Sequence, residues 1–572
     1  GLGDVYKRQG LILCLFITVI TVMARENKRQ RGQVRDKIKE MWGNIPKKEY
    51  SRDLLDSISH YFMRRESRES GFFLDDITWN DLDLDRIFML INQTMSSLGE
   101  DYLYYMLRKP EFAPENLQER QRLADYFRGH QEERVRLQLL LGNLKRLPTV
   151  SLSDSLYVLT DAKEHKRRKH IACALLMLLS ILVMIVIPKY GIFLMLGMMV
   201  FNVIQYLFSK QEIETYLSCI RSIMRLLEAA KETSKLPMPE LSEYLERIKR
   251  ARNELGQFSR GAGLVMNRSD AGGGLETIIL DYIRMIFHVD MIKFNSMLKE
   301  LQKHFGAVET LMETFGFLDS CIALASFREA MPYTCIPQFE EPGKRAAMEV
   351  TNLYHPLIKE PVANSISVAG GTLVTGSNAS GKSTFLKNVA VNAILAQTIG
   401  LCVATEYKSC YLRVMTSMAL RDDLQSGESY YIVEIKSLNR ILEATRETTP
   451  LLCVIDEVLR GTNTIERIAA SSNILAALCR DHVLSFAATH DIELSYMLKS
   501  LYTNYHFEEE VKEHDVVFNY LLKKGRATTR NAIRLLEMIG YDQKIIENAK
   551  RAAEIFEKKG AWAPVKKEEG QC

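Results

Sequence analysis

The chain has 572 residues, of which 26% are charged and 47% hydrophobic, and its formal net charge is +4. This composition excludes a largely disordered protein, and a prior of about 150 residues per domain predicts about three or four domains. The small net charge does not by itself establish a nucleic-acid partner, because phosphate binding depends on local Lys and Arg clusters. The ten cysteines show no metal-ligand spacing, which predicts reduced, cytosol-facing domains without structural zinc.

The N-terminal region predicts a membrane anchor. Residues 1–9 are polar and lack an initiating Met, so we regard them as a suspect start. The uncharged segment 10–24 is somewhat shorter than the about 17 to 25 residues of a spanning helix, but basic residues follow it, which favours an anchor with a cytosolic exit. The alternative is a signal-peptide core, although no small-residue cleavage site follows. Residues 25–78 are predicted to be a helical cytosolic linker.

Residues 79–165 have helical periodicity, and residues 170–208 then hold two apolar runs, Ile171–Ile187 and Tyr190–Phe208, separated by a Pro-Lys pair. Neither run has a polar face, so they predict a transmembrane hairpin. A buried helical pair in a soluble core is the alternative. Basic residues within 163–169 place the preceding end in the cytosol. The sequence therefore predicts a multi-pass protein of the cell membrane whose large soluble parts lie in the cytoplasm.

Residues 209–335 are predicted to be helices that lead back from the hairpin to the C-terminal part of the chain. An apolar stripe near their end recurs at three- and four-residue steps, as on one face of a long helix, and we expect it to be a packing surface. Its members are Ile279, Tyr282, Ile283, Ile286, Phe294, Met297, Leu301, Phe305, Val308, Leu311 and Phe315.

The segment Gly371–Ser383 reads as a strand, a loop and the start of a helix. Its Gly-x4-Gly-Lys-Ser spacing is that of a P-loop, in which backbone N–H groups and a helix N-terminus surround the phosphates of ATP. Lys382 would reach the β and γ oxygens, and the Ser383 hydroxyl would ligate Mg²⁺. The predicted nucleotide-binding residues are Gly376, Ser377, Asn378, Ala379, Ser380, Gly381, Lys382, Ser383 and Thr384.

Two further apolar runs end in residues that would complete such a site. Leu451–Ile455 leads into Asp456, predicted to hold Mg²⁺, and Glu457, predicted to polarise the attacking water. An acidic pair after a strand has a structural alternative, but its position after the P-loop favours function. Val483–Thr489 leads into His490, which we predict to sense the γ-phosphate, although a lone His is usually structural.

Several strings closely resemble the MutS family, in family order. Asp422–Ser429, followed by Glu434, resembles the MutS signature segment, Ile455–Thr464 resembles the segment of the acidic pair, and Ala488–His490 resembles the third motif. The resemblance implies an ATPase that acts as a dimer with composite sites, and it implies DNA as a binding partner.

The signature residues that the resemblance places in trans are Gly427 and Ser429, which would reach the nucleotide of the partner subunit. Ser377, Ala379 and Ser380 depart from the family's usual loop, Pro-Asn-Met-Gly-Gly. Pro361 stands where the family often has an aromatic residue that stacks on adenine, which removes one expected contact to the base.

The resemblance also implies the domain organisation. Residues 79–165 and 209–335 would be the outgoing and returning helices of the MutS lever, and residues 336–556 the ATPase with C-terminal dimerisation helices. Residues 557–572 are predicted to be a disordered tail. The predicted fold class is therefore multidomain α plus α/β: a helical lever region with transmembrane helices, followed by a P-loop, ABC-like α/β ATPase domain.

Two parts of the family are not recognised, namely the mismatch-recognition domain and the DNA-gripping clamp, where the sequence offers only Gly256–Gly274. A nuclease tail of the Smr type is not recognised either. The leading interpretation is a membrane-anchored, homodimeric MutS-type ATPase that uses ATP and Mg²⁺ to move its lever, with DNA as the partner implied by the family. The alternative is a membrane mechanoenzyme or scaffold that does not bind DNA. An ABC-type transporter fits poorly, because three apolar spans do not readily form a pore.

Overall fold

The computed structural model describes residues 22, 25, 26, 29, 32–144, 151–160, 162, 167–259, 282, 283, 285–341, 345–377, 380–418, 430–460, 462–511, 516–527, 532–560, 562 and 564. The chain divides into two compact units. The first unit comprises Gly1–Ser70, Phe88–Met106 and Glu119–Ala330, and the second comprises Gly71–Ile87, Leu107–Gln118 and Met331–Cys572. One unit is helical and the other α/β, which confirms the predicted multidomain α plus α/β class.

The first unit contains helices and no strand among its described residues. Its helices are α2 (Arg52–Glu66), α7 (Gln131–Leu141), α8 (Leu152–Thr160), α9 (Arg167–Val186), α10 (Pro188–Thr233), η1 (Pro239–Leu241), α11 (Ser242–Glu254), α12 (Gly256–Ser259), α14 (Val289–Lys303) and α15 (Phe305–Ala330). Three helices have residues in both units: α4 (Leu84–Ile91), α5 (Ser97–Arg108) and α6 (Pro114–Gly129). Buried side chains such as Phe127, Leu226 and Phe294 form its core.

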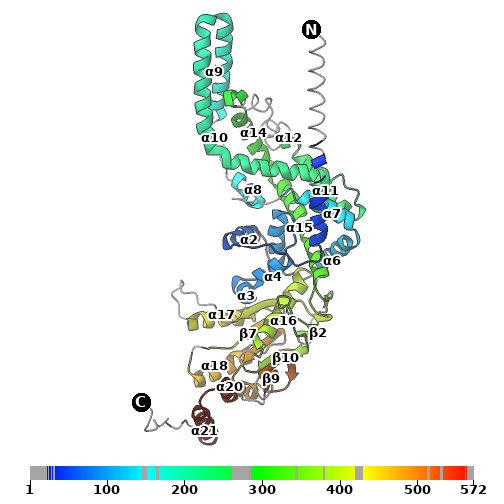
Figure 1. Cartoon of the computed structure of the whole chain (residues 1–572), viewed down its shortest axis with the longest axis vertical. Helices are drawn as coiled ribbons and strands as arrows, with labels where there is room; N and C mark the ends of the chain where they lie inside the picture. Colours follow the sequence, from blue (N-terminus) through cyan, green and yellow to red (C-terminus); the bar gives the residue numbers. More distant parts are fainter. Residues whose placement is uncertain are drawn as a thin grey trace. The chain divides into compact units, whose positions relative to one another are not determined.

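Helices α9 and α10 of the first unit pack side by side and contain the predicted hairpin (Figure 1). Pro188 starts α10, where its fixed φ and missing N–H suit the first turn of a helix. The helix then continues to Thr233, so the second apolar run and the start of the predicted returning segment form one element. Arg168–Val186 and Pro188–Lys210 are long and apolar enough to cross a membrane.

A third helix, Phe305–Ala330, meets the same criteria of length and composition, but 83% of its most apolar window is buried inside the protein. The corresponding fractions for the two hairpin helices are 22% and 17%. Burial therefore assigns α15 to the core and separates it from α9 and α10. The predicted anchor at 10–24 lies outside the described residues except for Val22.

The apolar stripe runs along α14 and α15, which are separated at His304, rather than along one helix. Its buried members in these two helices are Phe294, Met297, Leu301, Val308, Leu311 and Phe315. Tyr282 and Ile283 are exposed, and Ile279 lies outside the described residues. The packing role is thus seen for the part of the stripe in these two helices.

Helices α5 and α15 approach each other closely in the first unit. A Cβ on Gly316 would lie 2.8 Å from the backbone oxygen of Leu98, and a Cβ on Gly99 would lie 2.4 Å from the Asp319 carboxylate. That buried carboxylate accepts hydrogen bonds from the backbone N–H groups of Met95 (3.1 Å) and Ser96 (2.8 Å), just before α5 begins. Asp319 therefore satisfies donors that the start of a helix leaves without intrahelical partners.

The second unit contains a six-stranded sheet, ordered β10-β9-β4-β8-β7-β6, and a four-stranded sheet, ordered β1-β5-β2-β3. The strands are β1 (Gln338–Phe339), β2 (Ala347–Leu353), β3 (Asn364–Ala369), β4 (Gly371–Thr375), β5 (Glu406–Ser409), β6 (Arg413–Ser417), β7 (Leu451–Asp456), β8 (Val483–Thr489), β9 (Tyr502–Val511) and β10 (Val516–Lys524). The strands from β9 to β6 are parallel to their neighbours, and β10 is an antiparallel edge. The carboxyl ends of β4, β8 and β7 therefore meet at one edge of the sheet.

The helices of the second unit lie between these strands in the sequence and after them. They are α3 (Asp76–Asp81), α16 (Lys382–Thr398), α17 (Tyr430–Ala444), α18 (Thr464–Ala477), α19 (Ile492–Met497), α20 (Ala532–Ile539) and α21 (Gln543–Lys559). Helix α16 packs on β7 and β8. Helix α21 extends three residues past the predicted start of the tail at 557.

Residue 79, the expected start of the lever, does not coincide with a boundary between the two units. The short helix α3 belongs to the second unit, where the carboxylate of its last residue, Asp81, is held by hydrogen bonds. Asp81 accepts hydrogen bonds from the Thr416 hydroxyl at 2.7 Å and from the Met418 N–H at 2.9 Å. Lys387 pairs with Asp83 at 2.9 Å. Periodicity alone did not separate these residues from the helices that follow.

Candidate active site

The loop between β4 and α16 has the strand–loop–helix arrangement expected of a phosphate-binding loop. Gly376 has φ +152° and Gly381 has φ +102°, values that residues with a side chain rarely adopt. A Cβ on Gly376 would also lie 2.9 Å from the Ser380 hydroxyl, and a Cβ on Gly381 would lie 3.0 Å from the Tyr520 ring. The backbone conformation at these two positions therefore favours glycine strongly, and a side chain there would also crowd Ser380 or Tyr520.

Lys382 folds back over this loop from the first turn of α16. Its ammonium group donates hydrogen bonds to the backbone oxygens of Gly376 (2.8 Å) and Ser377 (2.7 Å). The side chain is buried, and burial lowers its pKa, although the carboxylates of Glu457 and Asp456 oppose the shift. The Ser380 hydroxyl is buried without a hydrogen-bond partner. A cation and an unpaired hydroxyl thus lie at the N-terminus of a helix, a site that favours anions.

The predicted acidic pair and His490 come together at the neighbouring strand ends. Asp456 ends β7, and the Glu457 N–H donates to the Ala488 oxygen of β8 at 3.0 Å. His490 Nδ1 lies 3.2 Å from Glu457 Oε1. This hydrogen bond lowers the pKa of Glu457 and raises that of His490. Because the pKa of His490 is raised, the ion pair is present at acidic pH and is lost as the pH rises through that raised value.

The turn after the acidic pair is strained. Glu457 has φ +60° and Leu459 has φ +59°, which is uncommon for residues other than glycine. Arg460, at the end of this turn, points back so that its Nε lies 2.5 Å from Glu457 Oε2. The Glu434 carboxylate of α17 accepts hydrogen bonds from the N–H groups of Leu459 (2.5 Å) and Arg460 (3.2 Å).

The donor set fits Mg²⁺. This ion prefers oxygen ligands and is commonly held by one or two protein groups together with phosphates and water. Asp456 Oδ1 is buried and has no hydrogen-bond partner, so an oxygen is available for a cation. Ser383 is exposed and lines the cavity that begins at Lys382. Among the described residues no group of three His, Cys, Asp or Glu side chains forms a metal cage.

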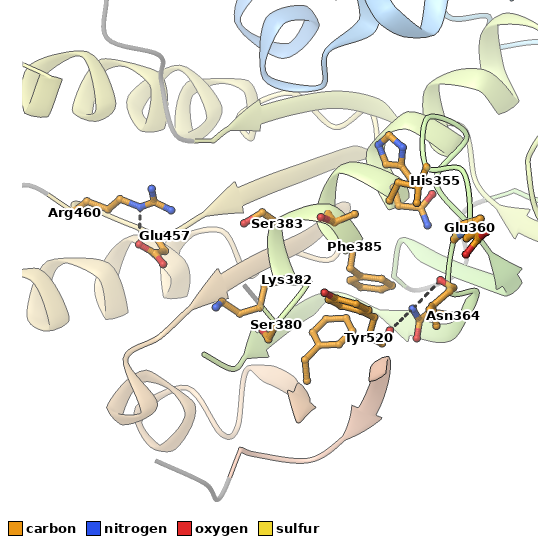
Figure 2. Close-up of a pocket in the computed structure, with 17 residues that line it drawn as sticks. His355, Glu360, Asn364, Ser380, Lys382, Ser383, Phe385, Glu457, Arg460 and Tyr520 are labelled. Carbon is orange, nitrogen blue, oxygen red and sulfur yellow. Dashed lines mark hydrogen bonds and ion pairs between the residues drawn. The ribbon is translucent and has the colours of Figure 1, made fainter. Parts of the chain in front are cut away.

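A cavity of about 490 Å³ extends from Lys382, and aromatic side chains line its other part. In Figure 2, Lys382, Ser380 and Ser383 lie between the Glu457–Arg460 pair on one side and Phe385, Tyr520 and His355 on the other. This volume is in the usual range for a small-molecule site. Its mixture of a cationic and an aromatic part suits a ligand with phosphates and a planar ring.

Tyr520 reaches this cavity from an irregular part of β10, where the pairing with β9 shifts register. It has φ +54°, and the Asn364 amide holds its backbone by donating to the Tyr520 oxygen (3.0 Å) while accepting from the Leu522 N–H (2.7 Å). The sequence motifs did not identify Tyr520 or Phe385 as functional, and they gave Glu434 no role beyond its place after the signature segment. One signal in the sequence was Pro361, which stands where the family often has an aromatic residue. An aromatic contact to the adenine would therefore come from another position in the chain.

The structure therefore brings together most of the described residues that were predicted for the site. The cavity is lined by Ser380, Gly381, Lys382, Ser383, Thr384 and Glu457, among others. Gly376 and Ser377 contact Lys382, and His490 contacts Glu457. Four predicted residues lie outside the described part of the chain: Asn378, Ala379, Gly427 and Ser429.

Comparison with known proteins assigns this region. Residues 372–557 match the family model for MutS domain V. The chain is 29% identical to human MutS protein homolog 4 over 288 residues. This aligned segment covers 47% of this chain and 30% of the human protein. It is 29% identical over 263 residues to the DNA mismatch repair protein MutS of Thermus thermophilus, covering 45% and 31%. With the corresponding protein of Listeria welshimeri it shares 27% identity over 297 residues, covering 49% and 34%.

The chain thus spans about a third of the length of these relatives. The matched model includes β4, the glycine loop, the acidic pair, His490 and the last helices. These are the same segments whose sequence strings carried the resemblance. Through this domain, the chain is similar to proteins of the MutS family.

Proposed function

We propose that the chain is a Mg²⁺-dependent ATPase whose site is the cavity between the β4–α16 loop and the ends of β7 and β8. The observation that carries this proposal is the position of Lys382 over a loop with two glycines of positive φ, beside an acidic pair at the end of a buried parallel strand. The match of residues 372–557 to MutS domain V supports it, because the resemblance to the MutS family implies an ATPase.

The residues of this site would have the following roles in hydrolysis. Lys382 would exchange its backbone acceptors for the β and γ oxygens of ATP, and the loop N–H groups would surround the phosphates. Ser383 and Asp456 would hold Mg²⁺, which supplies positive charge at the phosphates. Glu457 would orient and polarise the attacking water, and His490 would sense the γ-phosphate. Gly427 and Ser429 would act on the nucleotide of the partner subunit, so turnover would require a homodimer.

The first test is ATP hydrolysis by the full chain in detergent, with and without Mg²⁺, at several protein concentrations. We expect phosphate release that requires Mg²⁺ and whose specific rate rises with protein concentration, because each site needs a partner subunit. A specific rate that stays constant from nanomolar to micromolar protein would contradict the composite site. Absence of hydrolysis at every concentration would overturn the ATPase proposal.

Tyr520→Ala is expected to weaken ATP binding about 2- to 10-fold, because a ring stacked on a base contributes about 0.5 to 1.5 kcal/mol. Equilibrium binding of a fluorescent ATP analogue would measure this change. Tyr520→Phe is the matched control, since it keeps the ring and removes only the hydroxyl. Equal affinities of the Ala and Phe variants would show that Tyr520 does not contact the base.

We further propose that α9 and the first part of α10 cross the cell membrane as a hairpin, with the ATPase in the cytoplasm. Large apolar side chains on these helices are exposed, including Phe193 (74%) and Phe208 (68%). Soluble proteins rarely leave such contiguous apolar surface uncovered. In this proposal ATP-driven dimer closure moves the lever against the bilayer. A chain without residues 170–208 that kept its membrane localisation, ATPase rate and partners would count against this role.

DNA is the partner that the resemblance to the MutS family favours, and the relatives include proteins named for DNA mismatch repair. A non-DNA membrane mechanoenzyme is the second candidate, and the exposed apolar hairpin favours it. DNA binding by the ATP-bound protein, measured on duplex, mismatched and branched DNA across salt concentrations, separates the two. Tight binding that weakens steeply with salt supports DNA handling, whereas no binding at low salt supports the mechanoenzyme.

A further inference from the structure

We propose that Glu434 is a positioning residue for hydrolysis, which ties the turn that carries Glu457 to helix α17. This inference rests on the proposed ATPase function and assigns a role to a side chain outside the phosphate loop and the acidic pair. Glu434 does not line the cavity. It would act through the backbone of residues 457–460.

The contacts of the turn support this role. Two of its residues have positive φ, so its conformation has to be held by its surroundings. Three elements hold it: β8 accepts the Glu457 N–H at 3.0 Å, the Ser471 hydroxyl of α18 donates to the Val458 oxygen at 3.2 Å, and Glu434 of α17 accepts the N–H groups of Leu459 and Arg460. Of these, the Glu434 contact is the one made by an ionisable side chain.

Glu434 is only 8% exposed, and it accepts from two consecutive N–H groups. Hydrogen bonds to a charged acceptor are stronger than those between neutral groups. The pKa of Glu434 is raised by burial, and the two N–H groups oppose that shift without cancelling it. The Leu459 and Arg460 donors therefore favour the ionised carboxylate at this position.

Arg460 connects the hydrogen bonds of Glu434 to Glu457, the predicted catalytic carboxylate. Its backbone N–H binds Glu434, and its side chain pairs with Glu457 at 2.5 Å. A shift of α17 relative to the turn would therefore change the direction of Arg460 and, with it, the orientation of Glu457. In the sequence, α17 begins at Tyr430, directly after the segment predicted to reach the nucleotide of the partner. Glu434 is thus placed to couple the position of that segment to hydrolysis.

The test compares Glu434→Gln with Glu443→Gln, an exposed glutamate on the same helix. Glutamine has the same size, but its NH₂ group cannot accept the second backbone N–H. We expect Glu434→Gln to lower kcat about 10- to 100-fold, as misplacement of a catalytic group does. The ATP Kd and the thermal midpoint should stay close to those of the Glu443→Gln variant. The specific ATPase rate of Glu434→Gln should also rise less steeply with protein concentration than that of Glu443→Gln.

A double-mutant cycle with Arg460→Ala tests the route of coupling. If Glu434 acts through the turn, the losses in kcat of the two single variants will not add in the double variant. Additive losses, or a Glu434→Gln variant with the kcat of the control, would overturn the inference while leaving the ATPase proposal intact. A parallel loss of ATP affinity and thermal stability would also overturn it, because it would indicate a purely structural residue. Absence of turnover in the unsubstituted chain would overturn both.

Discussion

Replacing Glu457 with Gln is expected to lower kcat for ATP hydrolysis by at least about 100-fold, the lower end of what a positioned general base contributes. Glutamine preserves the size of the side chain but removes the negative charge that polarises water. The pairing with His490 and Arg460 lowers the pKa of Glu457, so the wild-type side chain is a carboxylate throughout the neutral range. Single-turnover hydrolysis of radiolabelled ATP measures the chemical step directly.

ATP binding should persist in this variant, because Lys382 and the glycine loop are unchanged. We therefore expect ATP-bound, closed dimers to accumulate, which mass photometry in the presence and absence of ATP would detect. Glu466→Gln is the control, since Glu466 lies on α18 just beyond the same loop and is exposed. A Glu457→Gln variant that turns over ATP at the wild-type rate would remove Glu457 from the proposed mechanism.

The sequence predicted the strands that lead into the candidate site well, because each buried parallel strand is a short, continuous apolar run. The run Val483–Thr489 is β8, and Leu451–Ile455 is β7 apart from the final Asp456. Motif spacing placed Gly376 and Gly381 at the two positions where φ is positive and where a Cβ would meet another atom. Local pattern and local geometry agree here because the loop is short and its conformation depends on glycine.

The residues that sequence analysis missed reach the site through long-range contacts. Tyr520 enters the cavity only because β10 changes register and Asn364 holds its backbone, across more than 150 positions of sequence. Glu434 was quoted as part of a string, but its contact with the turn at Leu459 depends on how α17 packs. Periodicity also could not show that α3 belongs with the second unit, since the ties of Asp81 to Thr416 and Met418 are tertiary.

Two glycines of the helical unit illustrate the same limit. Gly99 and Gly316 are far apart in the sequence, and the structure shows that both lie where α5 and α15 approach within contact distance. A single sequence does not reveal that these two positions are neighbours. The predicted functions of the hairpin, the in-trans residues and the tail stay predictions, because they concern a membrane, a partner subunit or residues outside the described part of the chain.

Replacing Lys382 with Ala is expected to weaken ATP binding about 10- to 100-fold, since hydrogen bonds to charged groups contribute about 1.5 to 3 kcal/mol each. Lys382 is the buried cation over the glycine loop, and its present acceptors are two backbone oxygens at 2.8 and 2.7 Å. Isothermal titration with a non-hydrolysable ATP analogue gives the affinity. Lys387→Ala is the matched control on α16, because that lysine pairs with Asp83 and does not contact the loop.

The Lys382 and Glu457 variants together separate binding from chemistry. If the site works as proposed, Lys382→Ala mainly raises the ATP Kd and prevents ATP-dependent dimer closure. Glu457→Gln leaves the ATP Kd unchanged and blocks hydrolysis, the step after closure. A Lys382→Ala variant with the affinity of the Lys387→Ala control would mean that the phosphates do not bind at this loop. The positive φ of Gly376 and Gly381 would then need an explanation other than phosphate binding.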